Sequence, residues 1–285
     1  VKELPEQPLS FEIDTDALTI KIIYQNGLYN FTAQNADEYP HVQTITNGAT
    51  VVTIGSAVLN NSITRSIFAT AQDELRPVMN GVYFDIHTDD LTFVASDGHK
   101  LVRLRNLAVK SPERASFILP KKPANLLKNL LAKESEQVLI KFDDNNAYIT
   151  CTNFEMVCRL IEGRYPNYNS VIPQENPFKV TIDRISFLNA LKRVSVFSNP
   201  ASSLVKLHLK DSLITVSAQD IDFSTSAEER IVCQFDGTEL SIGFKATYLI
   251  EILGNISSEE VVLELADPSR AGLIVPSEND EDEDL

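Results

Sequence analysis

The order of the predicted helices and strands repeats along the chain, and this internal repeat constrains the fold most strongly. A helix, several strands, a second helix and further strands follow one another over residues 49–172, and the same series returns over 177–276. The first helices of the two copies share one spacing of Leu and Phe: Leu59 with Phe68, and Leu188 with Phe197. Such a long repeat excludes a solenoid, so each copy must fold as a domain with its own core.

Alternation of apolar and polar residues predicts that most of each copy is β-structure. The predicted strands are 18–23, 81–86, 91–95, 101–105, 138–142, 147–151, 205–209, 213–217 and 261–265. Short turn sequences such as Asp89-Asp90 and Lys210-Asp211 separate them, which favours antiparallel hairpins over parallel crossover units.

Four segments have the periodicity of amphipathic helices instead: 56–72, 121–133, 184–200 and 245–255. Each has an apolar stripe that predicts its buried face. The stripes are Leu59, Ile63 and Ile67; Leu126, Leu127, Leu130 and Leu131; Phe187, Leu188, Leu191 and Val194; and Leu249, Ile250 and Leu253.

The N-terminal region resembles the second half of a copy. PEQPLSFEI near the start is similar to ESEQVLIKF at 134–142, and DEYPHV at 37–42 is similar to GRYPNY at 163–168. We therefore expect an α+β fold of repeated domains: a partial domain over 1–48, a complete one over 49–174, and a third with an acidic tail over 175–285.

The charge of the chain is sorted by element. The formal net charge is −15, which by itself argues against DNA binding. However, the four predicted helices together contain nine Lys or Arg and one acid, Glu251, and six acids lie in the tail SENDEDEDL. If the helices share one side of the molecule, that side is a basic stripe that can bind phosphate backbones.

No motif for catalysis, a cofactor or a metal is present. The three cysteines, Cys151, Cys158 and Cys233, lack zinc-type spacing and suit a reducing compartment, so we expect a cytoplasmic protein. The sequence has no apolar stretch of about 18 residues that could span a membrane. Asp97 and His99 could form an acid–base pair, but Asp-Gly is first of all a turn sequence.

Several motifs together resemble the bacterial sliding clamp family, the beta subunit of the replicative DNA polymerase III. They are MNG at 79–81, VASDGHKLVRLR at 94–105, ILPKK at 118–122, RYPNYNSVIP at 164–173 and SIGFKATYLIEIL at 241–253. This resemblance implies domains with antiparallel sheets outside and amphipathic helices on an inner face. It implies a homodimeric ring around duplex DNA, without chemistry of its own and without a cofactor, that binds DNA regardless of sequence.

The resemblance also implies a pocket for short linear motifs of the polymerase, the clamp loader and repair proteins. Carried over by motif, the pocket residues are Met79, Ser96, Gly98, His99, Lys100, Leu101, Pro166, Ser170 and Val171. Among the helix cations, those that we expect to face DNA are Arg65, Lys121, Lys122, Lys192 and Arg193.

Two departures from the family pattern modify these expectations. The first domain begins midway, so we expect this chain alone to be monomeric. The tail stands where relatives have an apolar strand with a Met-Pro segment, so we expect the pocket to be open on that side. Two alternatives stay open: an enzyme that uses Asp97 and His99, and a structural repeat protein without a nucleic-acid role.

Overall fold

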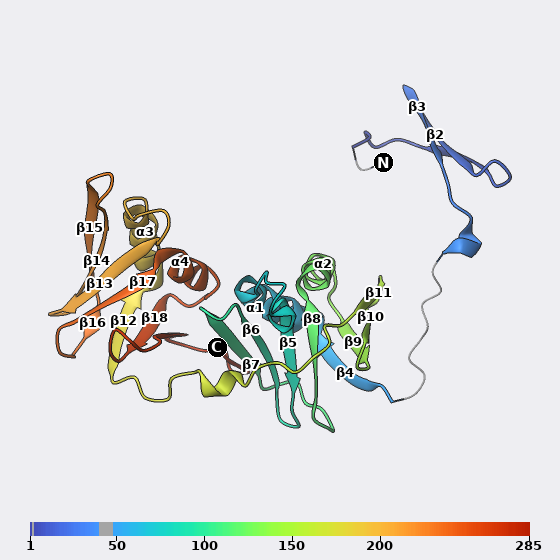
Figure 1. The fold of residues 1–285 in the computed structure, drawn as a ribbon. Coiled ribbons are helices and arrows are strands. Elements are labelled where there is room, and N and C mark those ends of the chain that lie inside the picture. The colour runs from blue at the N-terminus through green and yellow to red at the C-terminus, as the bar shows by residue number, and fades with distance from the viewer. Residues whose placement is uncertain (2, 40–47) are drawn as a thin grey trace. The chain divides into compact units, whose positions relative to one another are not determined.

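Short turns join neighbouring strands throughout the chain, so that sheets are built from hairpins. In the computed structural model, which describes residues 1, 3–39 and 48–285, every strand pair is antiparallel. The described chain divides into two units, Val1–Thr44 and Ile45–Leu285 (Figure 1). The predicted hairpin architecture is therefore confirmed.

The first unit is a three-stranded meander in the order β1-β2-β3. Its strands are β1 (Ser10–Asp14), β2 (Thr19–Tyr24) and β3 (Gly27–Thr32), followed by a short 3-10 helix, η1 (Ala36–Glu38). Phe11 and Phe31 are exposed on this sheet, whereas Ile22 is buried. The predicted similarity of 37–42 to 163–168 lies partly outside the described residues.

The second unit contains two modules with a similar order of helices and strands, which we call the central module and the C-terminal module. The central module comprises β4 (Thr50–Gly55), α1 (Ser56–Ser66), η2 (Ile67–Ala69), η3 (Pro77–Met79), β5 (Gly81–Ile86), β6 (Leu91–Ser96), β7 (Leu101–Asn106), β8 (Ala115–Pro120), α2 (Lys121–Leu131), β9 (Gln137–Phe142), β10 (Asn146–Thr150) and β11 (Glu155–Arg159). A linker with η4 (Tyr168–Ser170) follows it.

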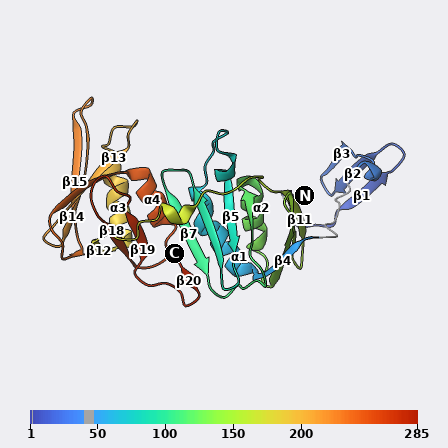
Figure 2. The ribbon, with the colours of Figure 1, turned by 60° about the horizontal axis from the view of Figure 1, so that its bottom comes forward.

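The C-terminal module comprises β12 (Phe178–Asp183), α3 (Arg184–Ser195), β13 (Leu204–Lys210), β14 (Leu213–Asp220), β15 (Thr225–Val232), β16 (Gln234–Phe235), β17 (Leu240–Lys245), α4 (Ala246–Gly254), β18 (Glu260–Leu265) and β19 (Leu273–Pro276). A last strand, β20 (Glu283–Asp284), returns to the central module and pairs with β7 (Figure 2).

Sheet order confirms the internal repeat. In the central module the two sheets run β11-β10-β9-β4 and β7-β6-β5-β8. In the C-terminal module the corresponding orders are β19-β18-β12, with β16 added beyond β12, and β15-β14-β13-β17. In both modules the first strand pairs with the strand that follows the second helix, which is the same topology built twice.

Each module buries a pair of helices against its two sheets. In the central module α1 packs on α2, and Leu59, Ile63 and Leu127 are fully buried. In the C-terminal module α3 packs on α4, where Phe187 and Leu191 are fully buried. Figure 1 shows the four helices along the upper side of the second unit, with strands below and beside them.

The structure differs from the sequence prediction at helix ends and at one stripe. Helix α1 ends at Ser66 and passes into a 3-10 turn, and α3 ends at Ser195, so both α-helices are shorter than predicted. Leu126 was expected on the buried stripe of α2, but 52% of it is exposed. Residues Leu127 and Leu131, one turn apart, make the buried line, and Leu126 lies about 100° around the helix from Leu127.

This difference predicts unequal effects of two neighbouring substitutions in α2. Leu127→Ala should lower the free energy of unfolding by about 2–5 kcal/mol because it opens a cavity in the core. Leu126→Ala, its matched control, should change it by about 0.5 kcal/mol or less because Leu126 is 52% exposed and lies outside the core. Urea unfolding followed by circular dichroism measures both, and equal losses would show that α2 packs through a different face.

Candidate functional site

The turn between β6 and β7 forms the first wall of the candidate site. The Ser96 hydroxyl donates to the Lys100 carbonyl at 2.9 Å and accepts the N–H of Gly98 at 3.1 Å. Oδ1 of Asp97 accepts the N–H groups of His99 and Lys100, each at 2.9 Å. Gly98 has a φ of +88°, which favours glycine. Short polar side chains thus hold the turn in one shape.

Lys100 connects this turn to the C-terminal module. Its side chain is 8% exposed, and its ammonium pairs with Asp97 at 2.7 Å and with Glu251 of α4 at 3.1 Å. The same ammonium lies 4.8 Å from the ring centre of Tyr248, also on α4. A buried ammonium needs such partners because burial without them is costly.

The ionisation of this pair follows from its surroundings. Burial lowers the pKa of Lys100, but its hydrogen bonds and ion pairs with Asp97 and Glu251 outweigh burial and raise the pKa above the usual value. Burial likewise raises the pKa of Asp97, but the hydrogen bonds from Lys100 and from the turn amides prevail and lower it. Both groups therefore carry their charges at neutral pH.

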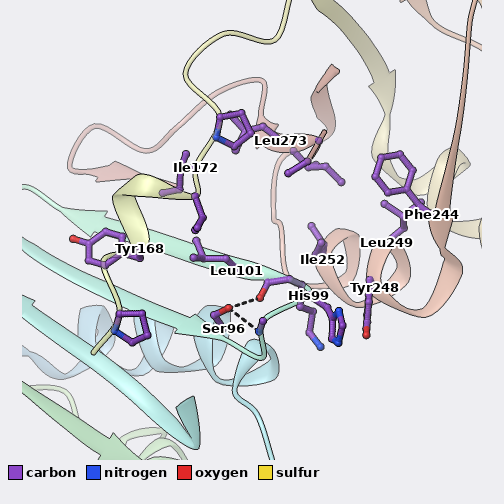
Figure 3. Close-up of a pocket in the computed structure, with 18 of the residues that line it drawn as sticks. Ser96, His99, Leu101, Tyr168, Ile172, Phe244, Tyr248, Leu249, Ile252 and Leu273 are labelled. Atoms are coloured by element: carbon purple, nitrogen blue, oxygen red, sulfur yellow. Dashed lines mark hydrogen bonds between the residues drawn. The ribbon is translucent and has the colours of Figure 1, made fainter. Parts of the chain in front are cut away.

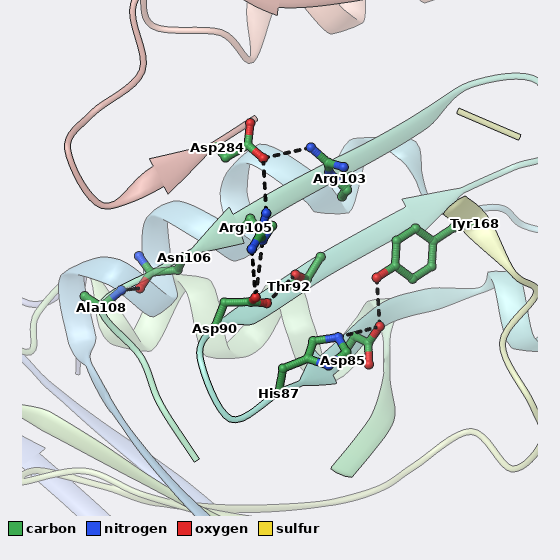
Figure 4. A network of polar contacts seen from close by, with 10 residues as sticks. All are labelled: Asp85, His87, Asp90, Thr92, Arg103, Arg105, Asn106, Ala108, Tyr168 and Asp284. Carbon is green, nitrogen blue, oxygen red and sulfur yellow. Dashed lines mark hydrogen bonds and ion pairs between the residues drawn. The ribbon is translucent and has the colours of Figure 1, made fainter. Parts of the chain in front are cut away.

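The linker between the modules supplies the second wall. The ring of Tyr165 stacks on Tyr83 of β5 at 4.6 Å between centres, and the Tyr168 hydroxyl donates to Asp85 at 2.7 Å (Figure 4). Burial and the nearby Asp85 carboxylate raise the pKa of Tyr168, so its hydroxyl stays protonated and can donate. These contacts fix the linker against the central sheet, and Val171 beyond them is 63% exposed.

The C-terminal module closes the site with apolar side chains. Tyr248, Leu249 and Ile252 of α4 line it together with Phe244 of β17 and Leu273 of β19 (Figure 3). The His99 ring stacks on Tyr248 across the module boundary, with ring centres 6.1 Å apart. The site is thus assembled from both modules and the linker.

Together these walls enclose a cavity of about 420 Å³, which we call the junction pocket. Eight of the nine residues predicted for the partner pocket line it: Met79, Ser96, Gly98, His99, Lys100, Leu101, Pro166 and Val171. The polar groups lie mainly in the β6–β7 turn, and the remaining lining is largely apolar. An apolar hollow with few polar groups is typical of a ligand-binding site.

Ser170 is the predicted pocket residue that does not line the cavity. It is exposed in η4, where its hydroxyl donates to the Asn167 carbonyl at 2.7 Å. We also expected the pocket to be open on the side of the C-terminal tail. This prediction was wrong, because Leu273 and Ile274 of β19 line the pocket there. The short run Leu273–Pro276 is a strand because it pairs with β18 across the sheet.

Sequence reasoning did not find the residues that α4, β17 and β19 contribute. Leu249 was expected to be core, and it is indeed buried while still lining the cavity. Tyr248 and Phe244 stand in the motif SIGFKATYLIEIL, which indicated only membership of the third domain. A cavity between two modules leaves no periodic signal in either, so only their packing reveals it.

The five residues predicted to face DNA differ in exposure. Lys122, Lys192 and Arg193 are exposed and Lys121 is half-buried. The Arg193 guanidinium binds Glu229 of β15 through two hydrogen bonds of 2.7 and 2.6 Å. Arg65 is only 8% exposed and pairs with Glu283 at 2.6 Å, so its placement in the structure argues against a contact with DNA.

The geometry does not favour acid–base chemistry at Asp97 and His99. The Asp97 carboxylate is engaged by the turn amides and Lys100, while the His99 ring contacts Tyr248. Within residues 1, 3–39 and 48–285, no group of three or more His, Cys, Asp or Glu side chains could hold a metal ion. None of the helices in that same part of the chain is long and apolar enough to cross a membrane.

Comparisons with known proteins agree with this architecture. The family model of the DNA polymerase III beta subunit central domain matches residues 53–167, and that of its C-terminal domain matches residues 169–285. A curated beta sliding clamp from Pseudomonas aeruginosa is 29% identical over 283 residues, covering 98% of this chain and 76% of that protein. One from Bacillus subtilis is 29% identical over 278 residues, covering 96% and 73%.

Solved structures are also similar over nearly the whole chain. A sliding clamp from Pseudomonas aeruginosa bound to griselimycin has a TM-score of 0.91 at 27% identity, covering 99% of this chain and 76% of that one. The DNA polymerase III beta subunit from Thermotoga maritima has a TM-score of 0.89 at 25% identity, with 99% and 76% covered.

The lowered pKa of Asp97 predicts a pH-dependent effect of Asp97→Asn. The charged carboxylate stabilises the turn above its usual pKa, and this benefit is lost as the pH falls through the lower pKa of the folded state. At about pH 7 the variant should lose about 1–3 kcal/mol of unfolding free energy, and this difference should shrink by about pH 3. Urea unfolding at both pH values measures it.

Asp144→Asn, at an exposed aspartate of the β9–β10 turn, is the control. It should change the unfolding free energy by about 0.5 kcal/mol or less at either pH. A deficit of Asp97→Asn that stays constant as the pH falls would contradict the role given to its charge.

Proposed function

The chain belongs to the beta sliding clamp family of bacterial DNA polymerase III, and we propose that it recruits partner proteins through the junction pocket. It is a DNA sliding clamp, an accessory protein that makes the polymerase processive. We assign to the pocket the short linear motifs of the polymerase, the clamp loader and repair proteins.

The character of the junction pocket supports this assignment. Its walls combine adaptable apolar side chains such as Met79 and Leu101 with aromatic ones such as Tyr248. The amides and the Ser96 hydroxyl of the β6–β7 turn hold its own shape, and the turn adds the His99 imidazole as a polar group that can orient a peptide. An apolar anchor in a concave pocket, with polar groups at its rim, is the usual arrangement of binding hot spots. The observation that carries the proposal is the convergence of eight predicted residues on one cavity.

A pair of neighbouring substitutions tests the pocket. Val171→Asp places a charge at an exposed residue that lines the cavity, so it should weaken binding of a short peptide containing Gln and Leu or Phe by about tenfold or more. Ser170→Asp adds the same charge one residue away, outside the lining, and should leave the affinity within about twofold. Fluorescence polarisation measures the peptide affinity of both variants. If the unmodified chain shows no saturable binding, the assignment of the pocket is wrong.

For DNA we propose contacts from helix cations that are exposed or, in the case of Lys121, half-buried. Lys121, Lys122 and Lys192 stand on helices that lie along one side of the second unit (Figure 1). We also propose Arg193 as a DNA contact, in which a DNA phosphate displaces Glu229 from its guanidinium. Diffuse attraction to phosphates binds duplex DNA regardless of sequence, which allows a clamp to slide.

The salt dependence of DNA binding tests this arrangement. In the double variant Lys122→Gln with Lys192→Gln, the slope of log affinity against log salt should fall by about two, because each lysine that no longer neutralises a phosphate lowers it by about one. Lys206→Gln is the control, because Lys206 is exposed on β13, between the inward-facing Val205 and Leu207. Fluorescence anisotropy with a duplex at several salt concentrations measures the slopes, and equal slopes for all proteins would overturn the proposal.

The remaining features of the function are also proposals. We infer a homodimeric ring and action in the cytoplasm without chemistry of its own. Exposed apolar residues on the C-terminal module favour a contact with another chain: Val196 at 77%, Phe197 at 40%, Ile221 at 80% and Phe223 at 76% exposure. We also propose that the chain divides into domains at 1–48, 49–174 and 175–285.

A further inference from the structure

The segment Ser277–Leu285, which we call the strap, leaves the C-terminal module and binds to the central module. Its strand β20 pairs with β7, joining Glu283 to Asn106 and Asp284 to Arg105. The N–H of Leu107 donates to the Asp282 carbonyl at 2.8 Å. A sheet of the central module thereby includes a strand from the opposite end of the second unit (Figure 2).

Helix α1 holds the Glu283 carboxylate by both of its oxygens. Arg65 donates from Nη1 to Oε2 at 2.6 Å, and Asn61 donates from Nδ2 to Oε1 at 3.1 Å. Arg65 and Asn61 are four residues apart and so project from one face of α1. The side chains of Arg65 and Glu283 are each 10% exposed. Removing one member would leave the other charge buried without its counterion, which is strongly unfavourable.

The next two residues of the strap add a charged and an apolar contact. Asp284 accepts a hydrogen bond from Arg103 at 2.8 Å, and Arg105 lies 3.9 Å away while also binding Asp90 (Figure 4). Leu285 packs against the hydrophobic cores of both modules and against the small cluster around Ala95. The strap therefore crosses the module boundary with ion pairs, backbone hydrogen bonds and one shared apolar side chain.

The strap also lies beside the junction pocket. Asp284 and Leu285 line a second cavity of about 270 Å³. Five residues line both cavities, so the two adjoin: Leu101, Ile172, Ile252, Leu273 and Ile274. A shift of the strap would therefore also displace residues that line the junction pocket.

We propose that Arg65 is a positioning residue for the junction pocket. By binding Glu283 it holds the strap across the boundary, and the strap keeps the two modules at the distance that forms the pocket. This inference rests on the proposed function of the pocket. It gives Arg65 a different role from the DNA contact that its sequence position indicated.

A double-mutant cycle on the unmodified 285-residue background tests the proposal. Arg65→Gln and Glu283→Gln should each speed hydrogen exchange of the Leu107 amide by about tenfold or more, because β20 loses its anchor. Each should also weaken peptide binding several-fold. The double variant should be little worse than either single one, because both remove the same interaction. Exchange is measured by NMR or mass spectrometry, and affinity by fluorescence polarisation.

Glu281→Gln is the matched control, because Glu281 is an exposed acid of the same strap. It should leave both exchange and affinity unchanged. If Arg65→Gln prevents folding, Glu283→Gln still decides the question, because the amide oxygen of the new glutamine can accept a hydrogen bond from Arg65 and only the ion pair is lost.

The two measurements separate failure of the strap from failure of the pocket. If exchange at Leu107 is unchanged in both single variants, or if the effects in the double variant are fully additive, the claim that Arg65 anchors the strap through Glu283 is wrong. Faster exchange with unchanged peptide affinity would refute the positioning role. If the unmodified chain binds no peptide, the pocket assignment fails and the positioning role fails with it, while exchange still reports whether Arg65 anchors the strap.

Discussion

The structure depends on burying one face of a helix pair against two antiparallel sheets, and each module does this once. Leu59 and Ile63 in one module, and Phe187 and Leu191 in the other, have no exposed surface. Because these apolar faces turn toward the sheets, the opposite faces of the helices are left to polar and basic residues. The packing that makes the core therefore determines which helix face carries charged residues, whereas the positive sign of those residues, in a chain of net charge −15, comes from the sequence alone.

The junction pocket is a consequence of joining two such modules rather than a property of either. Lys100 reaches Glu251 and Tyr248 across the boundary, and Tyr165 and Tyr168 hold the linker on the central sheet. These contacts form a hollow whose polar groups come mainly from one turn and whose apolar wall comes mainly from the other module. A binding site of this kind requires that both modules and the linker be held together.

Predictions from the sequence were accurate where local periodicity decides the structure and weaker where partners lie far along the chain. The four helices and the predicted strands follow from their apolar patterns, but β4, β12 and β17 were not predicted, although buried and more exposed residues alternate in them too. Strand β15, TSAEERIV, was missed because it is an edge strand with few buried side chains, so its pairing with β14 decides it. Leu126 was misplaced because four leucines in α2 allow more than one stripe, and the sheets determine which face is buried.

The sequence by itself determined the repeat, the antiparallel hairpins and the residues of the β6–β7 turn, since short-range spacing and side-chain hydrogen bonds specify them. Only the tertiary structure decided which of those residues share a cavity, and that Ser170 lies outside it. It also decided the fate of Arg65. Its place on a basic helix indicated a phosphate contact, yet Glu283, 218 positions away, lies close enough to neutralise it. Charge on a helix is readable from the sequence, whereas the counterion is chosen by packing.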